Sequence, residues 1–203
     1  MNLIKIIVKL GALIALAALF LPGLFTPWRE ALYDLSEVEG RRQINSVIAL
    51  QKGGLPDSKC MIGDSMVITW LPRDYEKTAE GEQSVYFKAF VSIATPIGAD
   101  QTPKLENVRI RSSENDGWTD LGSCSEYATE TNDRWVTKYH ELRLPKRFEP
   151  QEGTNVYVQV VVSATEKSNM DDSQHPFFKT FSYVFIPKIW SGRSELVHWF
   201  TSL

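Results

Sequence analysis

The sequence is poor in the residue types that build metal and redox centres. Its 203 residues include two cysteines, Cys60 and Cys124, and three histidines. The cysteines form no Cys-x-x-Cys pair and no histidine lies near either in sequence, which argues against a redox or zinc site. We therefore expect no metal and no cofactor. In an oxidising compartment such a pair most simply forms one disulfide, and two free buried thiols are the alternative.

Several other signatures are missing. The 22 basic and 25 acidic residues give a net charge of −3 without a basic stripe, so nucleic acid is not an expected partner. The chain has no phosphate-cradling glycine loop and no paired-carboxylate pattern. It also has no Asn-x-Ser/Thr glycosylation site, which favours a bacterial periplasm over a eukaryotic exported setting.

A long uncharged segment opens the chain. Lys5 and Lys9 precede residues 10–25, which carry no charge. A bilayer core needs about 20 helical residues, and a helix from Ile6 reaches this length if Lys9 snorkels to the headgroups. Residues 1–25 are therefore predicted to form a transmembrane signal-anchor. Its anchoring residues are Lys5, Lys9, Leu10, Leu13, Leu16 and Phe20.

A cleaved signal peptide is the alternative, but the zone after the apolar run has no small-x-small cleavage site. The basic flank predicts an anchor in the inner membrane with a cytoplasmic N-terminus and the rest of the chain in the periplasm.

Residues 26–55 show helical spacing. Thr26 and Pro27 suit a helix start, and glycines 53 and 54 suit its end. We predict a juxtamembrane amphipathic helix over about 27–51. Its apolar face comprises Trp28, Leu32, Leu35, Ile44, Val47 and Ile48. This face would contact the chain's own β domain, a partner protein or the bilayer.

From residue 56 to 190 the pattern has a period of two, which is typical of strands. The predicted strands are 65–71, 84–95, 104–111, 134–144, 154–165 and 177–187. Many strands separated by turn signals predict a mainly β fold, an antiparallel sandwich. Residues 191–203 then form a short amphipathic helix whose Trp199 and Phe200 pack on the domain or reach the membrane interface.

Two stretches of the β region resemble each other. Residues 71–95 and 144–165 share a Leu-Pro start, a Glu-Gly turn and a strand with tyrosine and serine at matching places. An internal repeat would give the sandwich two similar halves, and a chance match between strands is the alternative.

Two further resemblances concern the fold. Phe148, Pro150, Gly153 and Tyr157 resemble the strand E–F corner of fibronectin type III modules. The order Cys60, Trp70, Cys124 is similar to the Cys–Trp–Cys order of immunoglobulin domains, although Trp70 follows Cys60 closely and Gly122 stands in place of the corner tyrosine. Both imply an immunoglobulin or fibronectin III type of sandwich.

One set of residues resembles a catalytic site. Gly63-Asp64-Ser65 is similar to the nucleophile block of SGNH serine hydrolases, and Asn115-Asp116 and Asp172-x-x-His175 are similar to their later blocks. The resemblance implies Ser65 as nucleophile, His175 as base, Asp172 as its orienting group and Asn115 in the oxyanion hole. That family is α/β, whereas the residues after Ser65 and His175 alternate as strands do.

The sequence therefore favours a non-enzymatic role. We expect a single-pass membrane protein whose exported sandwich binds protein partners as an accessory or assembly subunit of an envelope complex. A membrane-anchored serine hydrolase is one alternative. A sandwich that binds carbohydrate or a small ligand through Trp118 and Trp135 is another, although such tryptophans also pack in cores.

Overall fold

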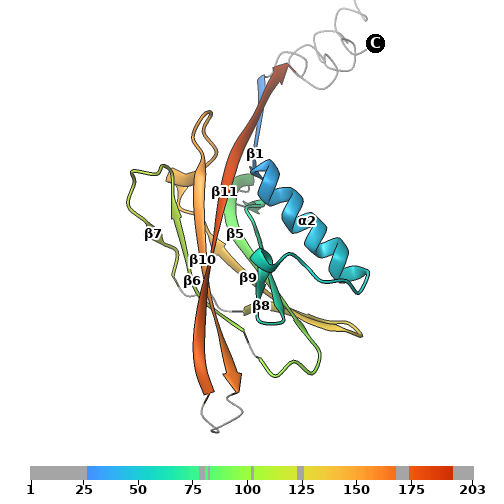
Figure 1. Ribbon diagram of the computed structural model, residues 1–203. Helices are drawn as coiled ribbons and strands as arrows, with labels where there is room; N and C mark the ends of the chain where they lie inside the picture. The colour runs from blue at the N-terminus through green and yellow to red at the C-terminus, as the bar shows by residue number, and fades with distance from the viewer. Residues whose placement is uncertain are drawn as a thin grey trace, which may run out of the picture. The chain divides into compact units, whose positions relative to one another are not determined.

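The computed structural model describes residues 27–193 except 78–80, 82, 102, 123–125 and 168–173 (Figure 1). The chain divides into two units, residues 32–188 and residues 1–31 with 189–203. In the smaller unit the described residues are the outer ends of β1 and β11. The sheets, the helix and the core described below belong to the larger unit.

The elements follow one another in the order β1 (Pro27–Leu35), α2 (Glu37–Gln51), η1 (Ser58–Cys60), β2 (Met61–Ile62), β3 (Ser65–Trp70), β4 (Arg73–Lys77), β5 (Gln83–Pro96), β6 (Lys104–Arg111), β7 (Thr119–Asp120), β8 (Glu126–Thr131), β9 (Trp135–Arg143), η2 (Lys146–Phe148), β10 (Val156–Lys167) and β11 (Gln174–Arg193).

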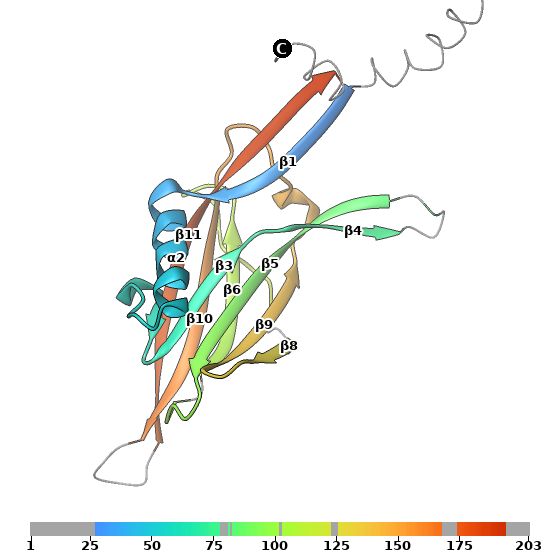
Figure 2. The same cartoon turned by 90° about the vertical axis from the view of Figure 1, so that its right-hand side faces the viewer.

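Two antiparallel sheets form a sandwich-like fold, as predicted (Figure 2). The first sheet has the strand order β1-β11-β10-β6-β7. The second has the order β2-β3-β5-β9-β8, and β4 pairs with β5 outside this path. All six predicted strands are present as β3, β5, β6, β9, β10 and β11.

The core lies between the sheets and follows the alternation of the sequence. Val156, Val158, Val160 and Val162 on β10 are all fully buried and face Val91 and the other inward residues of the second sheet. Burying a valine side chain contributes about 1.5–3 kcal/mol, so these four positions are a large part of the driving force.

The helix predicted over 27–51 is wrong for its first part. Residues 27–35 form strand β1, and the helix begins only at Glu37. Tyr33 is buried in the core and Leu35 packs against it, so this segment also satisfies a period of two. β1 pairs with β11, and the Ser36 amide donates a hydrogen bond of 2.9 Å to Val184 O. This pairing favours the strand over the helix for residues 27–35.

The C-terminal helix predicted over 191–203 is also corrected at its start, because residues 191–193 are the end of β11. Residues 194–203, with Trp199 and Phe200, lie outside the described residues, and so does the predicted anchor over 1–25. In the part that is described, no helix has the length and apolar character needed to cross a membrane.

The two similar stretches take different paths. After Pro72 the chain forms β4, which pairs with β5 in the same sheet. After Pro145 it forms η2 and continues as β10 in the opposite sheet. Leu71 and Leu144 are both buried, but the equivalent segments do not make equivalent connections.

Candidate functional site

Helix α2 buries polar side chains and exposes aliphatic ones. Gln43 and Ser46 are 7% and 1% exposed, whereas Val38, Ile44 and Ile48 are 67%, 60% and 40% exposed. An ordinary surface helix turns its apolar side to the core. Ile44 and Ile48, four residues apart, form a short aliphatic row that faces solvent, whereas Val38 lies about 120° around the helix from Ile44.

The buried side of the helix explains how it is held. Ser46 Oγ accepts a hydrogen bond of 3.1 Å from the Asp57 amide, which ties α2 to the segment before η1. Val47 and Leu50 pack against a small cluster that includes Cys60 and Met66. At 100° per residue Ser46 and Leu50 lie about 120–160° from Ile44 and Ile48, whereas Val47 lies only about 60° from Ile44. Docking the helix therefore leaves Ile44 and Ile48 exposed at the edge of its packed side.

A groove of about 660 Å³ lies beside Ile44. Its apolar lining residues are Leu35, Ile44, Trp70, Phe185 and Ile186. The charged residues at its rim are paired with one another, Glu37 with Arg41 and Asp34 with Lys188. The groove therefore combines apolar walls with a rim of little net charge. We call Ile44, Ile48, Trp70 and Ile186 the α2 surface.

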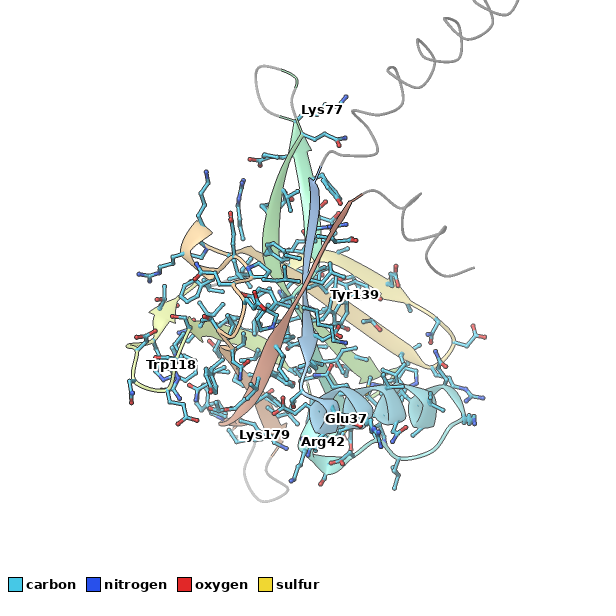
Figure 3. The ribbon with its side chains drawn as sticks, turned by 90° about the horizontal axis from the view of Figure 1, so that it is seen from above. Glu37, Arg42, Lys77, Trp118, Tyr139 and Lys179 are labelled. Carbon is cyan, nitrogen blue, oxygen red and sulfur yellow. The ribbon has the colours of Figure 1, made fainter. Side chains whose placement is uncertain are left out.

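An aromatic row continues from this groove across the outer face of the second sheet. The ring of Trp70 lies 4.6 Å from that of Phe90, which lies 5.6 Å from that of Tyr139 (labelled in Figure 3). The three side chains come from β3, β5 and β9 and are half-buried. Trp70 belongs to both features, so the apolar area extends from α2 onto the sheet.

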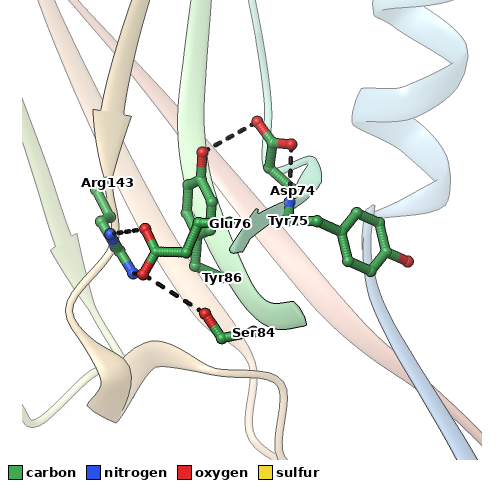
Figure 4. A network of polar contacts seen from close by, with 6 residues as sticks. All are labelled: Asp74, Tyr75, Glu76, Ser84, Tyr86 and Arg143. Atoms are coloured by element: carbon green, nitrogen blue, oxygen red, sulfur yellow. Dashed lines mark hydrogen bonds and ion pairs between the residues drawn. The ribbon is translucent and has the colours of Figure 1, made fainter. Parts of the chain in front are cut away.

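A polar network borders the aromatic row. Lys88 Nζ lies 2.9 Å from Asp74 and 2.6 Å from Glu141. Arg143 forms a two-pronged pair with Glu76, with N–O distances of 2.6 and 2.8 Å (Figure 4). Hydrogen bonding from Lys88 holds the pKa of Asp74 at about 2. These groups satisfy one another, so the network fixes β4 and β5 against β9.

The structure does not assemble a triad from the predicted catalytic residues it describes. Ser65 is completely buried, and its hydroxyl shares a hydrogen bond of 3.0 Å with Thr95. It begins strand β3, whereas a nucleophile elbow leads into a helix. Asn115 lies in an exposed turn after β6. Asp172 and the side chain of His175 lie outside the described residues.

The predicted disulfide gains no support. Cys60 is a free, buried thiol whose pKa is raised by burial, and Cys124 lies outside the described residues. No group of three His, Cys, Asp or Glu side chains that could hold a metal occurs among the residues described.

The residues predicted to contact a partner, the membrane or a sugar differ in their exposure. Leu35 packs on the core and Leu32 is half-buried, whereas the side chain of Trp28 lies outside the described residues. Trp118 stacks with Arg111, the guanidinium carbon lying 4.6 Å from the ring centroid. Trp135 packs against the cluster beneath α2. Neither tryptophan stands out as a free sugar-binding platform.

Sequence reasoning placed Ile44 and Ile48 on an apolar helix face but missed Trp70 and Phe90 as surface residues. A signal was present, because β3 and β5 carry apolar residues on both faces. A strand with this pattern has its outer face covered by something besides the main core.

No protein family, curated protein or solved structure compared with this chain matches it.

Proposed function

We propose that this chain is a membrane-anchored, non-catalytic accessory subunit of a cell-envelope complex and that it binds another protein through the α2 surface. The observation that carries the proposal is the exposure of Ile44 and Ile48 beside the apolar groove on a helix that is otherwise docked. A contiguous apolar area with a polar rim is typical of a protein–protein interface.

The composition of the surface supports this role. Trp70 is half-buried at the groove, and tryptophan is among the residues that most often anchor interfaces. The paired charges around it, such as Glu37 with Arg41, form a polar rim of little net charge. Such a rim favours a partner whose contact area is aliphatic or aromatic rather than strongly charged.

The membrane anchor and the periplasmic location rest on the sequence. Lys5 and Lys9 followed by residues 10–25 support a signal-anchor with a cytoplasmic N-terminus. A sandwich of the immunoglobulin or fibronectin III type is likewise proposed. Its support is the antiparallel arrangement and the corner near Phe148, whose carbonyl accepts a bond from the Tyr33 hydroxyl.

The test is recovery of a partner from detergent-solubilised membranes by the tagged chain and by two variants. Ile44→Glu places a charge in the α2 surface, whereas Val85→Glu places one at an exposed position of β5. We expect a stoichiometric partner with the unchanged chain and with Val85→Glu, and its loss with Ile44→Glu. Recovery of monomer alone from all three, or equal recovery by all three, would contradict the proposal.

A further inference from the structure

A second groove lies on the buried side of α2, away from the exposed aliphatic row. It has a volume of about 450 Å³ and is bounded by α2, η1 and β11. Its charged lining residues are Glu39, Arg42, Lys59 and Lys179. Cations outnumber acids there, although the whole chain carries a net charge of −3. A partly enclosed positive site concentrates anions.

The Arg42 side chain is partly buried and has one long ion pair. It is 24% exposed, and its Nε lies 3.6 Å from Asp57 Oδ2, which is too long for a hydrogen bond. Its terminal nitrogens make no hydrogen bond to any residue that the structure describes. A guanidinium in this setting normally places its planar fork on a carboxylate or phosphate.

Gln43, the next residue of α2, carries a second unsatisfied donor. Its Nε2 is fully buried and has no hydrogen-bond partner among the described residues. Leaving a buried amide unpaired costs about 1–3 kcal/mol. The Tyr183 hydroxyl, on the β11 side of the groove, also lacks a geometrically good bond, although Thr69 lies close enough to interact with it. An acceptor in the groove would therefore remove a penalty.

Lys179 supplies a fixed positive charge from the opposite wall. Its ammonium donates to Ser58 O at 2.8 Å and to Met61 O at 2.5 Å, which holds it against η1. No carboxylate of the described residues pairs with it. Lys179 on β11 and Arg42 on α2 are labelled in Figure 3 and line the same groove.

We propose that this groove binds a small oxyanion, a free or ligand-borne carboxylate or phosphate group. The Arg42 fork and the Gln43 amide donate to its oxygens, and the Lys179 ammonium balances its charge. An ordered water would satisfy Gln43 but would leave Lys179 without a carboxylate among the described residues and Arg42 with only its long contact to Asp57. Gln43 lines both grooves, but Arg42 and Lys179 line only this one, so the proposal does not depend on the proposed partner binding.

Calorimetric titration of the 203-residue chain in neutral detergent tests the site, with sodium phosphate in one arm and sodium citrate in the other. We expect saturable binding in at least one arm, and the tighter arm identifies the oxyanion. We expect Arg42→Gln and Lys179→Met each to weaken the affinity for that anion by about tenfold, because each removes a charge-assisted contact. The control Lys188→Gln, which removes an exposed lysine of the other groove, changes it less than about twofold.

Backbone amide shifts in a two-dimensional NMR spectrum of the unchanged chain give a second readout that needs no variant. Shifts confined to residues 39–43, 58–60 and 179–183 support the site. The proposal is overturned if neither anion saturates the protein below about 10 mM, if Lys188→Gln weakens binding as much as Arg42→Gln, or if the shifts spread over the whole surface.

Discussion

At the scale of single residues, one buried hydroxyl joins distant parts of the chain. Tyr33 on β1 donates a 2.9 Å hydrogen bond to Phe148 O, and its ring meets Phe87 edge-on at 5.6 Å. Tyr33→Phe keeps the ring and removes the bond, so we expect it to lower the free energy of unfolding by about 1–2 kcal/mol. Urea denaturation measures this. The control Tyr75→Phe, at an exposed tyrosine, should change the free energy of unfolding by less than about 0.5 kcal/mol. Equal losses in the two variants would show that the buried hydrogen bond contributes nothing.

The pair of Lys88 and Asp74 makes a prediction about pH. Lys88 holds the pKa of Asp74 at about 2, below its ordinary value of 3.8. Because the pKa is lower in the folded state, the pair stabilises the fold above pH 3.8 and loses this effect as pH falls toward 2. In Lys88→Met we expect the Asp74 pKa to rise and stability to fall less steeply over this range. NMR titration of the Asp74 carboxyl measures the shift, and an unchanged pKa would contradict the assigned cause.

Ser65 gives a third test at this scale. Its hydroxyl is buried and bonded to Thr95, whereas an attacking serine must reach both its base and the substrate. We expect no labelling of Ser65 by a fluorophosphonate probe. Labelling of the native chain that disappears in Ser65→Ala would revive the serine-hydrolase alternative.

At the scale of elements, helix α2 has two sides with different energetic roles. Val47 packs on the cluster beneath the helix, and Ile48 faces solvent. Val47→Ala should therefore cost about 1 kcal/mol of stability, and Ile48→Ala less than about 0.5 kcal/mol. Thermal unfolding of the two variants compares them directly. A larger loss for Ile48→Ala would mean that the exposed row packs within the chain itself.

The local sequence pattern predicts some strands and not others. The alternating valines of β10 made that strand predictable, since one face is buried along its whole described length. Strand β1 was not predictable from its sequence. Trp28, Leu32 and Leu35 fit helical spacing, whereas Tyr33 and Leu35 fit a strand. The pairing with β11, distant in sequence, decides between them. The two repeat-like stretches diverge for the same reason: local similarity does not specify which sheet the next strand joins.

The candidate sites were predictable only in part. Ile44 and Ile48 could be placed on one helix face, but which side of α2 meets the sandwich depends on the bond from Asp57 to Ser46 and the packing of Val47. The oxyanion groove was not visible in the sequence, since Arg42 and Lys179 are far apart and neither belongs to a motif. Their proximity follows from where β11 passes the helix.

At the scale of the whole molecule, the proposed role combines the described sandwich and docked helix with an anchor that rests on the sequence. The fold presents a fixed apolar area, and the residues described provide no assembled catalytic group. The central claim is that the α2 surface, rather than another face of the sandwich, meets a partner protein.

Site-specific photo-crosslinking in native membranes tests this claim most directly. A benzophenone amino acid is placed at position 48 on α2 or, as the matched control, at position 85 on β5, both of which are exposed and aliphatic. We predict a discrete crosslinked product from position 48, lost when Ile44→Glu is added, and none from position 85. No product from position 48, or the same product from both positions, would contradict the account.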